Sequence, residues 1–168
     1  MPVMATVTLG GNAVSLVGEP PAPAAPAPSF TLVKDDLSEL TGESLKGKKV
    51  VLNIFPSIDT PTCAKSVRRF NELAASMSDT VVVCVSADLP FAQKRFCGAE
   101  GIANVQNASS FRTDFGRAFG LTIADGVLKG LLARAVVVLD ERGVVRHSQL
   151  VPEIAHEPDY DAALAALK

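Results

Sequence analysis

Residues 48–63, KKVVLNIFPSIDTPTC, contain a predicted strand, a turn and the start of a predicted helix. The first eight, KKVVLNIF, are rich in β-branched and other apolar residues, which is typical of a strand buried on both faces. Pro56 ends this strand because proline cannot donate a ladder hydrogen bond. Thr60 and Pro61 suit the N-cap and the first position of a helix. The stretch therefore predicts that Cys63 lies in the first turn of a helix that follows a central strand.

The expected position of Cys63 points to a reactive sulfur. Backbone N–H groups in the first turn of a helix have no intrahelical partner, so they favour a thiolate over a neutral thiol. The alternative on these residues alone is a small hydrophobic side chain that packs at a helix start. Ionisation would explain only part of any reactivity, because a thiol that is about 3% ionised at pH 7 gains about 30-fold on full ionisation. Both interpretations stay open at this point.

Length and composition favour one domain over residues 1–168 with a substantial core, since 48% of the 168 residues are hydrophobic. A formal net charge of -2 gives no reason to expect nucleic acid, and no apolar run approaches membrane-spanning length. Residues 1–16 lack a basic segment followed by a continuous apolar block, so we expect mature structure and a cytoplasmic protein. Three cysteines do not suit a secreted disulfide framework.

Cofactor and metal sites are not expected. The glycines do not follow a strand at the spacing of a phosphate loop or a dinucleotide-binding motif. His147 and His156 are remote in sequence from every cysteine, so no metal site is predicted.

The remaining segments predict an α/β fold. The expected elements are a β-hairpin over residues 1–17, a proline-rich connector over 18–28, strands at Phe30–Val33 and Thr80–Ala87, a helix from Cys63 with Val67, Phe70, Ala74 and Met77 on its buried face, a helix at Pro90–Phe96 closed by Cys97 and Gly98, a helix carrying Phe111, Phe115 and Phe119, a hairpin of Ala135–Leu139 with Val144–Val151, and a helix at Asp159–Leu167. The late antiparallel pair indicates a mixed sheet rather than a doubly wound parallel one.

Several motifs together carry a family resemblance. The pattern Pro56-x-x-x-Thr60-x-x-Cys63 resembles the active-site signature of peroxiredoxins, and the strings NIFPSIDTPTCAKSVRRFN, SADLPFAQKRFCGAEG and LLARAVVVLD are similar to the thiol peroxidase subfamily, of the atypical 2-Cys type. The resemblance extends from the N-terminal hairpin to the tail EPDYDAALAAL. It implies a thioredoxin-like sandwich with a mixed central sheet flanked by helices, and a homodimer. It also implies an enzyme that reduces hydrogen peroxide and organic hydroperoxides with electrons from thioredoxin.

The resemblance also implies roles for individual residues. Cys63 would be the peroxidatic cysteine, which a hydroperoxide oxidises to a sulfenic acid. Thr60 would hydrogen-bond the thiolate and the peroxide, and Pro56 would shield the sulfur from water. Arg134 would stabilise the thiolate and bind the peroxide. Cys97 would be the resolving cysteine, which forms an intramolecular disulfide with Cys63.

Some alternatives stay open on the sequence. The Thr60 hydroxyl cannot both cap the helix fully and face a peroxide. Cys84, inside TVVVCVSA, is interpreted as a buried structural residue, with an alternate resolving role as the other choice. Phe111 and its helical neighbours would pack in the core or in a subunit interface. We further expect local unfolding around Cys63 and Cys97, because disulfide geometry needs Cα atoms within about 7 Å.

Two other functional classes use the same fold and residues. A thiol-disulfide oxidoreductase would need a Cys-x-x-Cys pair, whereas Cys63 is followed by Ala64, Lys65 and Ser66. A non-enzymatic redox sensor would pass the oxidation of Cys63 to a bound protein. Catalytic turnover of peroxide distinguishes an enzyme from a sensor.

Overall fold

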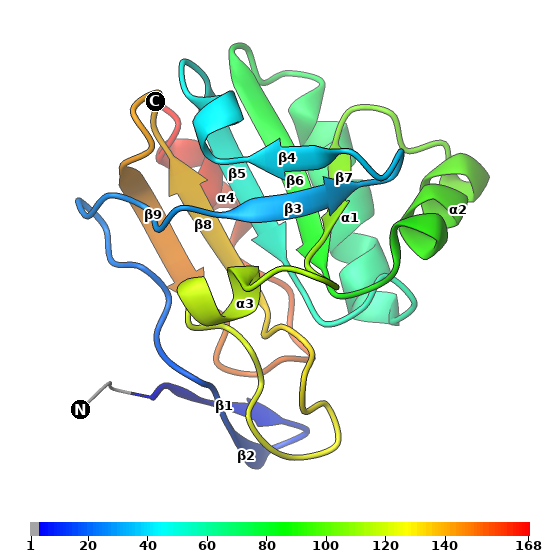
Figure 1. The fold of residues 1–168 in the computed structure, drawn as a ribbon, viewed down its shortest axis with the longest axis vertical. Coiled ribbons are helices and arrows are strands. Elements are labelled where there is room, and N and C mark those ends of the chain that lie inside the picture. The colour runs from blue at the N-terminus through cyan, green and yellow to red at the C-terminus, as the bar shows by residue number, and fades with distance from the viewer. Residues whose placement is uncertain (1–3) are drawn as a thin grey trace.

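The computed structural model describes residues 4–168, so residues 1–3 of the expected N-terminal hairpin segment lie outside the described part. Its elements are β1 (Thr6–Leu9), β2 (Asn12–Ser15), β3 (Thr31–Lys34), β4 (Glu39–Thr41), the 3-10 helix η1 (Glu43–Leu45), β5 (Lys49–Ile54), α1 (Pro61–Ala74), β6 (Thr80–Ser86), α2 (Pro90–Glu100), β7 (Gln106–Ser109), α3 (Phe115–Ala118), β8 (Ala135–Leu139), β9 (Val145–Leu150) and α4 (Tyr160–Ala165). Figure 1 shows them as one layered body with the β1–β2 hairpin at one end.

A seven-stranded sheet in the order β4-β3-β7-β6-β5-β8-β9 forms the centre of the fold. Strands β5, β6 and β7 pair in parallel, whereas β8 pairs antiparallel with both β5 and β9. The sheet is therefore mixed, which confirms the predicted α/β sandwich. Because β5 and β6 are parallel, their carboxyl ends lie at one edge of the sheet, where the turns after them can meet.

Both faces of the sheet are covered, which explains why β5 is mostly apolar. Val50, Leu52 and Ile54 point into the larger core cluster, which includes the hairpin residues Val7 and Val14. Val51 packs on the opposite face with Phe70 of α1 and Ala163 of α4.

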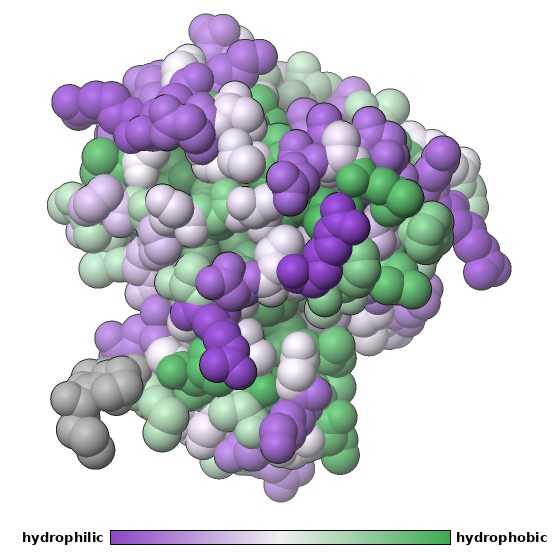
Figure 2. All heavy atoms as spheres, viewed as in Figure 1, coloured by the Kyte–Doolittle hydropathy of each residue, from purple (hydrophilic) through white to green (hydrophobic). Residues whose placement is uncertain are grey.

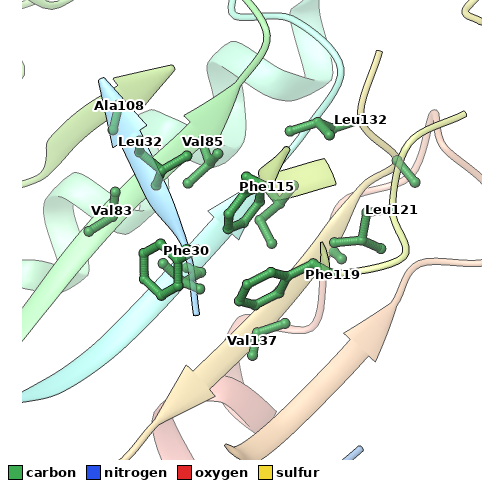
Figure 3. Packing of buried hydrophobic residues seen from close by; sticks show 14 of the residues in the cluster. Phe30, Leu32, Val83, Val85, Ala108, Phe115, Phe119, Leu121, Leu132 and Val137 are labelled. Atoms are coloured by element: carbon green, nitrogen blue, oxygen red, sulfur yellow. The ribbon is translucent and has the colours of Figure 1, made fainter. Parts of the chain in front are cut away.

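Three phenylalanines close the larger core on the face opposite α1 (Figure 3). Phe115 and Phe119 stack with their ring centroids 4.4 Å apart. Phe30 meets both rings edge to face, at 5.7 and 5.5 Å. Aromatic pairs in these arrangements contribute about 0.5–1.5 kcal/mol each beyond their buried area. The short helix α3 is therefore held in the core by the contacts of Phe115 and Phe119 with Phe30.

Three expectations about the elements are wrong, and two short strands were missed. Helix α2 continues through Cys97 and Gly98 to Glu100, and Gly101 ends it in the left-handed region at φ 66°. Helix α1 ends at Ala74, so Met77 lies beyond it and is only partly buried. Phe111 lies outside α3 and is 41% exposed, so it does not share the core with Phe115. The short strands β4 and β7 were not expected at all.

The proline-rich connector runs beside β9 rather than through solvent. Its Ala24 N–H donates to the Val145 carbonyl at 2.8 Å, and the Val145 N–H donates to the Ala25 carbonyl at 2.9 Å. The Ala27 N–H donates to Gly143, in the turn before β9, at 2.9 Å. These bonds satisfy backbone groups of an outer strand of the sheet, which would otherwise be open to pairing.

Candidate active site

Cys63 is the third residue of α1 and is only 1% exposed. The residue before the helix, Thr60, has extended backbone angles and is the N-cap. The Cys63 side chain packs with Phe55 and Ile58 from the turn after β5, and with Val67 and Cys84. The sulfur therefore lies in an apolar cluster at the carboxyl edge of the sheet, at the point where first-turn amides favour negative charge.

Arg134 is the charged group that reaches this sulfur. It precedes β8 and is 2% exposed, and its Nη2 donates to Cys63 Sγ at 3.2 Å. Its Nε donates to the carbonyl of Ile154 at 2.8 Å, which fixes the plane of the guanidinium group. Its Nη1 is buried and has no hydrogen-bond partner among the described residues. The structure thus brings a buried cation and one unused donor to the predicted nucleophile.

Thr60 and Pro56 shape the turn in front of Cys63. The Thr60 hydroxyl makes no cap hydrogen bond and donates instead to the Ser57 carbonyl at 3.0 Å. The Thr60 carbonyl begins the helix by accepting from the Ala64 N–H at 2.9 Å. Pro56 lies two residues after the end of β5 and is buried. The side chain of Thr60 therefore does not serve as the helix cap.

Cys97 lies in the last turn of α2, away from the Arg134 site. It is half-buried beside a cavity of about 250 Å³ that Asp35 and Asn107 also line. Asn107 Nδ2 donates to Cys97 Sγ at 2.8 Å. Burial, and secondarily the Asp35 carboxylate, raises the pKa of the Cys97 thiol to about 11. Cys63 and Cys97 are not bonded to each other, because all three cysteines are free.

Cys84 is fully buried in β6, the middle strand of the sheet. Asn53 Nδ2 lies 3.6 Å from its sulfur, and burial raises the pKa of its thiol to about 12. A neutral buried thiol of this kind acts as a small hydrophobic residue. The environment of Cys84 supports the structural interpretation.

The segment after β9 holds Arg134 in place, which no motif in the sequence indicated. The Glu153 carboxylate accepts from the Gly11 and Ala155 N–H groups, both at 2.9 Å, and from the Thr8 hydroxyl at 3.0 Å. The two backbone bonds lower the pKa of Glu153 to about 2, so it stays ionised at all ordinary pH values. The N-terminal hairpin thereby anchors the segment whose Ile154 carbonyl orients the guanidinium. A backbone acceptor has no sequence signature.

Asp88 is a second residue that sequence analysis missed. It follows β6 and accepts hydrogen bonds from Ser57 Oγ and the Ile58 N–H at 2.8 and 2.7 Å. Its position in the sequence could have indicated this role. Asp88 follows β6, which is parallel to β5, so it lies at the same end of these strands as the turn before Cys63.

Within residues 4–168, no helix is long and apolar enough to cross a membrane, and no group of three His, Cys, Asp or Glu side chains is arranged to hold a metal ion.

Comparisons with known proteins identify the family of this chain. Residues 22–164 match the Redoxin family. The chain is 60% identical to the thiol peroxidase of Mycobacterium bovis, over 98% of this chain and 99% of that protein. The thiol peroxidase of Mycobacterium tuberculosis matches it to the same extent.

Solved structures show the same fold over nearly the whole chain. A peroxiredoxin-like protein from Aquifex aeolicus superposes with a TM-score of 0.92 at 45% identity, covering 98% of this chain and 96% of that one. A thiol peroxidase from Chromobacterium violaceum gives 0.90 at 23% identity, covering 99% and 97%, which supports the fold. With a thioredoxin-like mixed sheet and this identity to thiol peroxidases along its length, the chain belongs to the thiol peroxidase subfamily of the peroxiredoxins, enzymes that use a thiol reductant to reduce hydroperoxides.

Proposed function

We propose that Cys63 is the peroxidatic cysteine of this enzyme and that Arg134 activates both the sulfur and the peroxide. The observation that carries the proposal is the 3.2 Å contact between Arg134 Nη2 and Cys63 Sγ in a buried site. The thiolate attacks one peroxide oxygen, the S–O bond forms and the O–O bond breaks. Cys63 becomes a sulfenic acid, and the second oxygen leaves with a proton as water or an alcohol.

The proposed site supplies donors where negative charge develops. As the O–O bond lengthens, charge moves onto the leaving oxygen, and the Nη1 of Arg134, which has no partner among the described residues, would donate to it. The Thr60 hydroxyl, which caps nothing, would turn from the Ser57 carbonyl to the peroxide. Pro56, buried beside the turn, would keep water from the sulfur.

In the second step of the proposal, Cys97 resolves the sulfenic acid. Its sulfur attacks the sulfur of Cys63, a Cys63–Cys97 disulfide forms, and the sulfenic oxygen leaves as water. Two electrons from the dithiol of thioredoxin then reduce this disulfide by exchange, and thioredoxin is oxidised. We place this cycle in the cytoplasm, where thioredoxin keeps thiols reduced.

For Cys97 to attack the sulfenic acid, α2 must open, because Cys97 lies inside a helical turn and its sulfur accepts a hydrogen bond from Asn107. Phe96 packs against the Cys63 cluster, but the polar contact at the very end of α2 is weak. Glu100 pairs with Arg68 of α1, but both side chains are well exposed, and exposed pairs contribute about 0–1 kcal/mol. Gly98 lies within the helix and lowers its stability by about 1 kcal/mol relative to alanine. The last turn of α2 is therefore suited to local unfolding.

Two glycine variants should change the resolving step in opposite directions. A Cβ at Gly98 meets no atom within 4 Å, so Gly98→Ala should stabilise α2 by about 1 kcal/mol and slow disulfide formation about fivefold. Gly101 has φ 66°, so Gly101→Ala should weaken the end of the helix and speed the step about fivefold. Quench-flow alkylation with mass analysis measures the rates. Equal rates in both variants would show that resolution does not use opening of α2.

We also propose a homodimer formed through the start of α2 and the loop after β7. Leu89, Phe91 and Phe111 are 51%, 65% and 41% exposed, which is high for large apolar side chains. The segment that leads through Leu89 into the first turn of α2 is tied to the loop that carries Phe111, because Ser109 Oγ donates to the Asp88 carbonyl. Figure 2 shows apolar residues gathered on the α2 side of the molecule.

Sedimentation tests the dimer. The wild-type protein should sediment as a dimer, and Phe91→Asp should sediment as a monomer because it buries a charge in the interface. A dimer that is unaffected by Phe91→Asp would place the interface elsewhere.

A coupled assay tests the proposed cycle as a whole. With thioredoxin, thioredoxin reductase and NADPH present, NADPH oxidation should continue for many turnovers with hydrogen peroxide and with an organic hydroperoxide. Peroxide loss that stops at one equivalent of protein would refute thioredoxin as the reductant. Comparison of the two peroxides gives the substrate preference, and the apolar neighbours Phe55 and Ile58 favour the organic one.

A further inference from the structure

Asp88 connects the turn before Cys63 to the strand that precedes α2. Its Oδ1 accepts from Ser57 Oγ at 2.8 Å, and its Oδ2 accepts from the Ile58 N–H at 2.7 Å. The same Oδ2 accepts from Ser86 Oγ, at the end of β6, at 2.6 Å. The described residues pair no cation with Asp88. Its charge is therefore balanced by hydrogen-bond donors, two of which belong to the turn after β5.

Helix α2 joins the same network through a buried amide. Gln93 is 1% exposed, and its Nε2 donates to Ser86 Oγ at 3.1 Å and to the Ala108 carbonyl at 3.0 Å. Both amide protons of Gln93 thus fix the first turn of α2 to β6 and β7. Cys97 lies one turn further along the helix, beyond the last of these bonds.

We infer that Asp88 is a positioning residue that holds the turn before Cys63 closed and thereby sets how often the Cys63–Cys97 disulfide can form. The inference rests on the proposed roles of the two cysteines. The network fixes the first turn of α2 but does not include the last turn, which carries Cys97. For the disulfide to form, the turn around Cys63 must also leave Arg134, and the bonds to Asp88 oppose this movement.

The direction of the effect follows from populations. While the closed form dominates, weakening the Asp88 bonds multiplies the small open fraction and hardly changes the closed one. Peroxide reacts with the closed form, in which Arg134 contacts the sulfur, and the disulfide forms from the open one. Weaker bonds should therefore speed resolution and leave peroxide attack nearly unchanged.

The experiment measures the two steps separately in wild type, Asp88→Asn and Ser57→Ala. The chain has no Trp, so acid quench, thiol alkylation and mass analysis after one equivalent of peroxide replace fluorescence. In Asp88→Asn, an amide N–H₂ replaces one of the two carboxylate oxygens that accept these hydrogen bonds. Because the turn is then held less tightly, disulfide formation should be about tenfold faster. Ser57→Ala removes one neutral donor, and the step should be about threefold faster. Oxidation of Cys63 should change less than about twofold in both.

A matched control removes a carboxylate from another turn. Asp140 accepts from the Arg142 and Val144 N–H groups at 2.9 and 3.0 Å, so Asp140→Asn should reduce stability without changing either step. Both steps slowing together in Asp88→Asn, or both staying at the wild-type rate, would overturn the inference. An equal speed-up in Asp140→Asn would also overturn it. If wild type forms no Cys63–Cys97 disulfide, the proposed function fails first, and this outcome is separate from the others.

Discussion

Cys63→Ser is expected to lose peroxide turnover by at least about 10⁴-fold, because a neutral hydroxyl cannot replace a thiolate as nucleophile toward an O–O bond. The substitution is nearly isosteric, and the side chain is 1% exposed, so the fold should persist. NADPH oxidation in the thioredoxin-coupled assay measures the loss, and circular dichroism checks the fold.

Two other cysteine variants serve as controls for this prediction. Cys97→Ser should still consume one equivalent of peroxide and then stop, because the sulfenic acid formed on Cys63 has no resolving partner in this variant. Cys84→Ser should keep most of the turnover, since Cys84 is a buried packing residue. Turnover in Cys63→Ser close to that of wild type would show that another thiol is the nucleophile.

Arg134→Met should slow the oxidation of Cys63 by about 10²–10³-fold, the usual loss when one preorganised donor to a developing negative charge is removed. Ionising a thiol from about 3% to completion gains only about 30-fold, so most of the loss should come from transition-state stabilisation. Arg134→Lys should recover only part of the rate, because an ammonium cannot contact Cys63 Sγ and the Ile154 carbonyl in the same fixed plane. Quench-flow oxidation with limiting peroxide gives the rate constants.

Arg69→Gln is the control for removing an arginine. Arg69 is about half exposed and pairs with Glu72 within α1, so its loss should change the rate by less than about twofold. An Arg134→Met variant that folds and reacts at the wild-type rate would contradict the proposed role of Arg134.

The sequence predicted the central strands and α1 because their residues carry the pattern of burial. The run around Cys84 is apolar without interruption, and β6 indeed lies in the middle of the sheet. Strand β7, QNAS, is short and polar, so it has no apolar pattern to detect, although three of its residues are buried. Gly98 was interpreted as the end of α2, but the left-handed cap is formed by Gly101. Sequence alone could not decide which glycine ends the helix.

For the candidate site, sequence located the side chains but not what orients them. Cys63, Thr60 and Arg134 were named from motifs, and the structure places Arg134 against Cys63 although 71 positions separate them. The Ile154 carbonyl and the Asp88 carboxylate were missed. A carbonyl is present at every residue, and the role of Asp88 depends on two strands being parallel neighbours. Cys97 and Cys63 are both free thiols. The sulfur of Cys63 lies in an apolar cluster, whereas Cys97 lines a separate cavity.

Disulfide mapping tests the central claim most directly. The reduced protein is treated with one equivalent of hydroperoxide, quenched in acid, alkylated and digested, and the linked peptides are identified by mass. The predicted result is one intramolecular disulfide between Cys63 and Cys97, with Cys84 alkylated as a free thiol. A main product that links Cys63 to Cys84, or a Cys63 that remains a free thiol after the peroxide is consumed, would contradict the account.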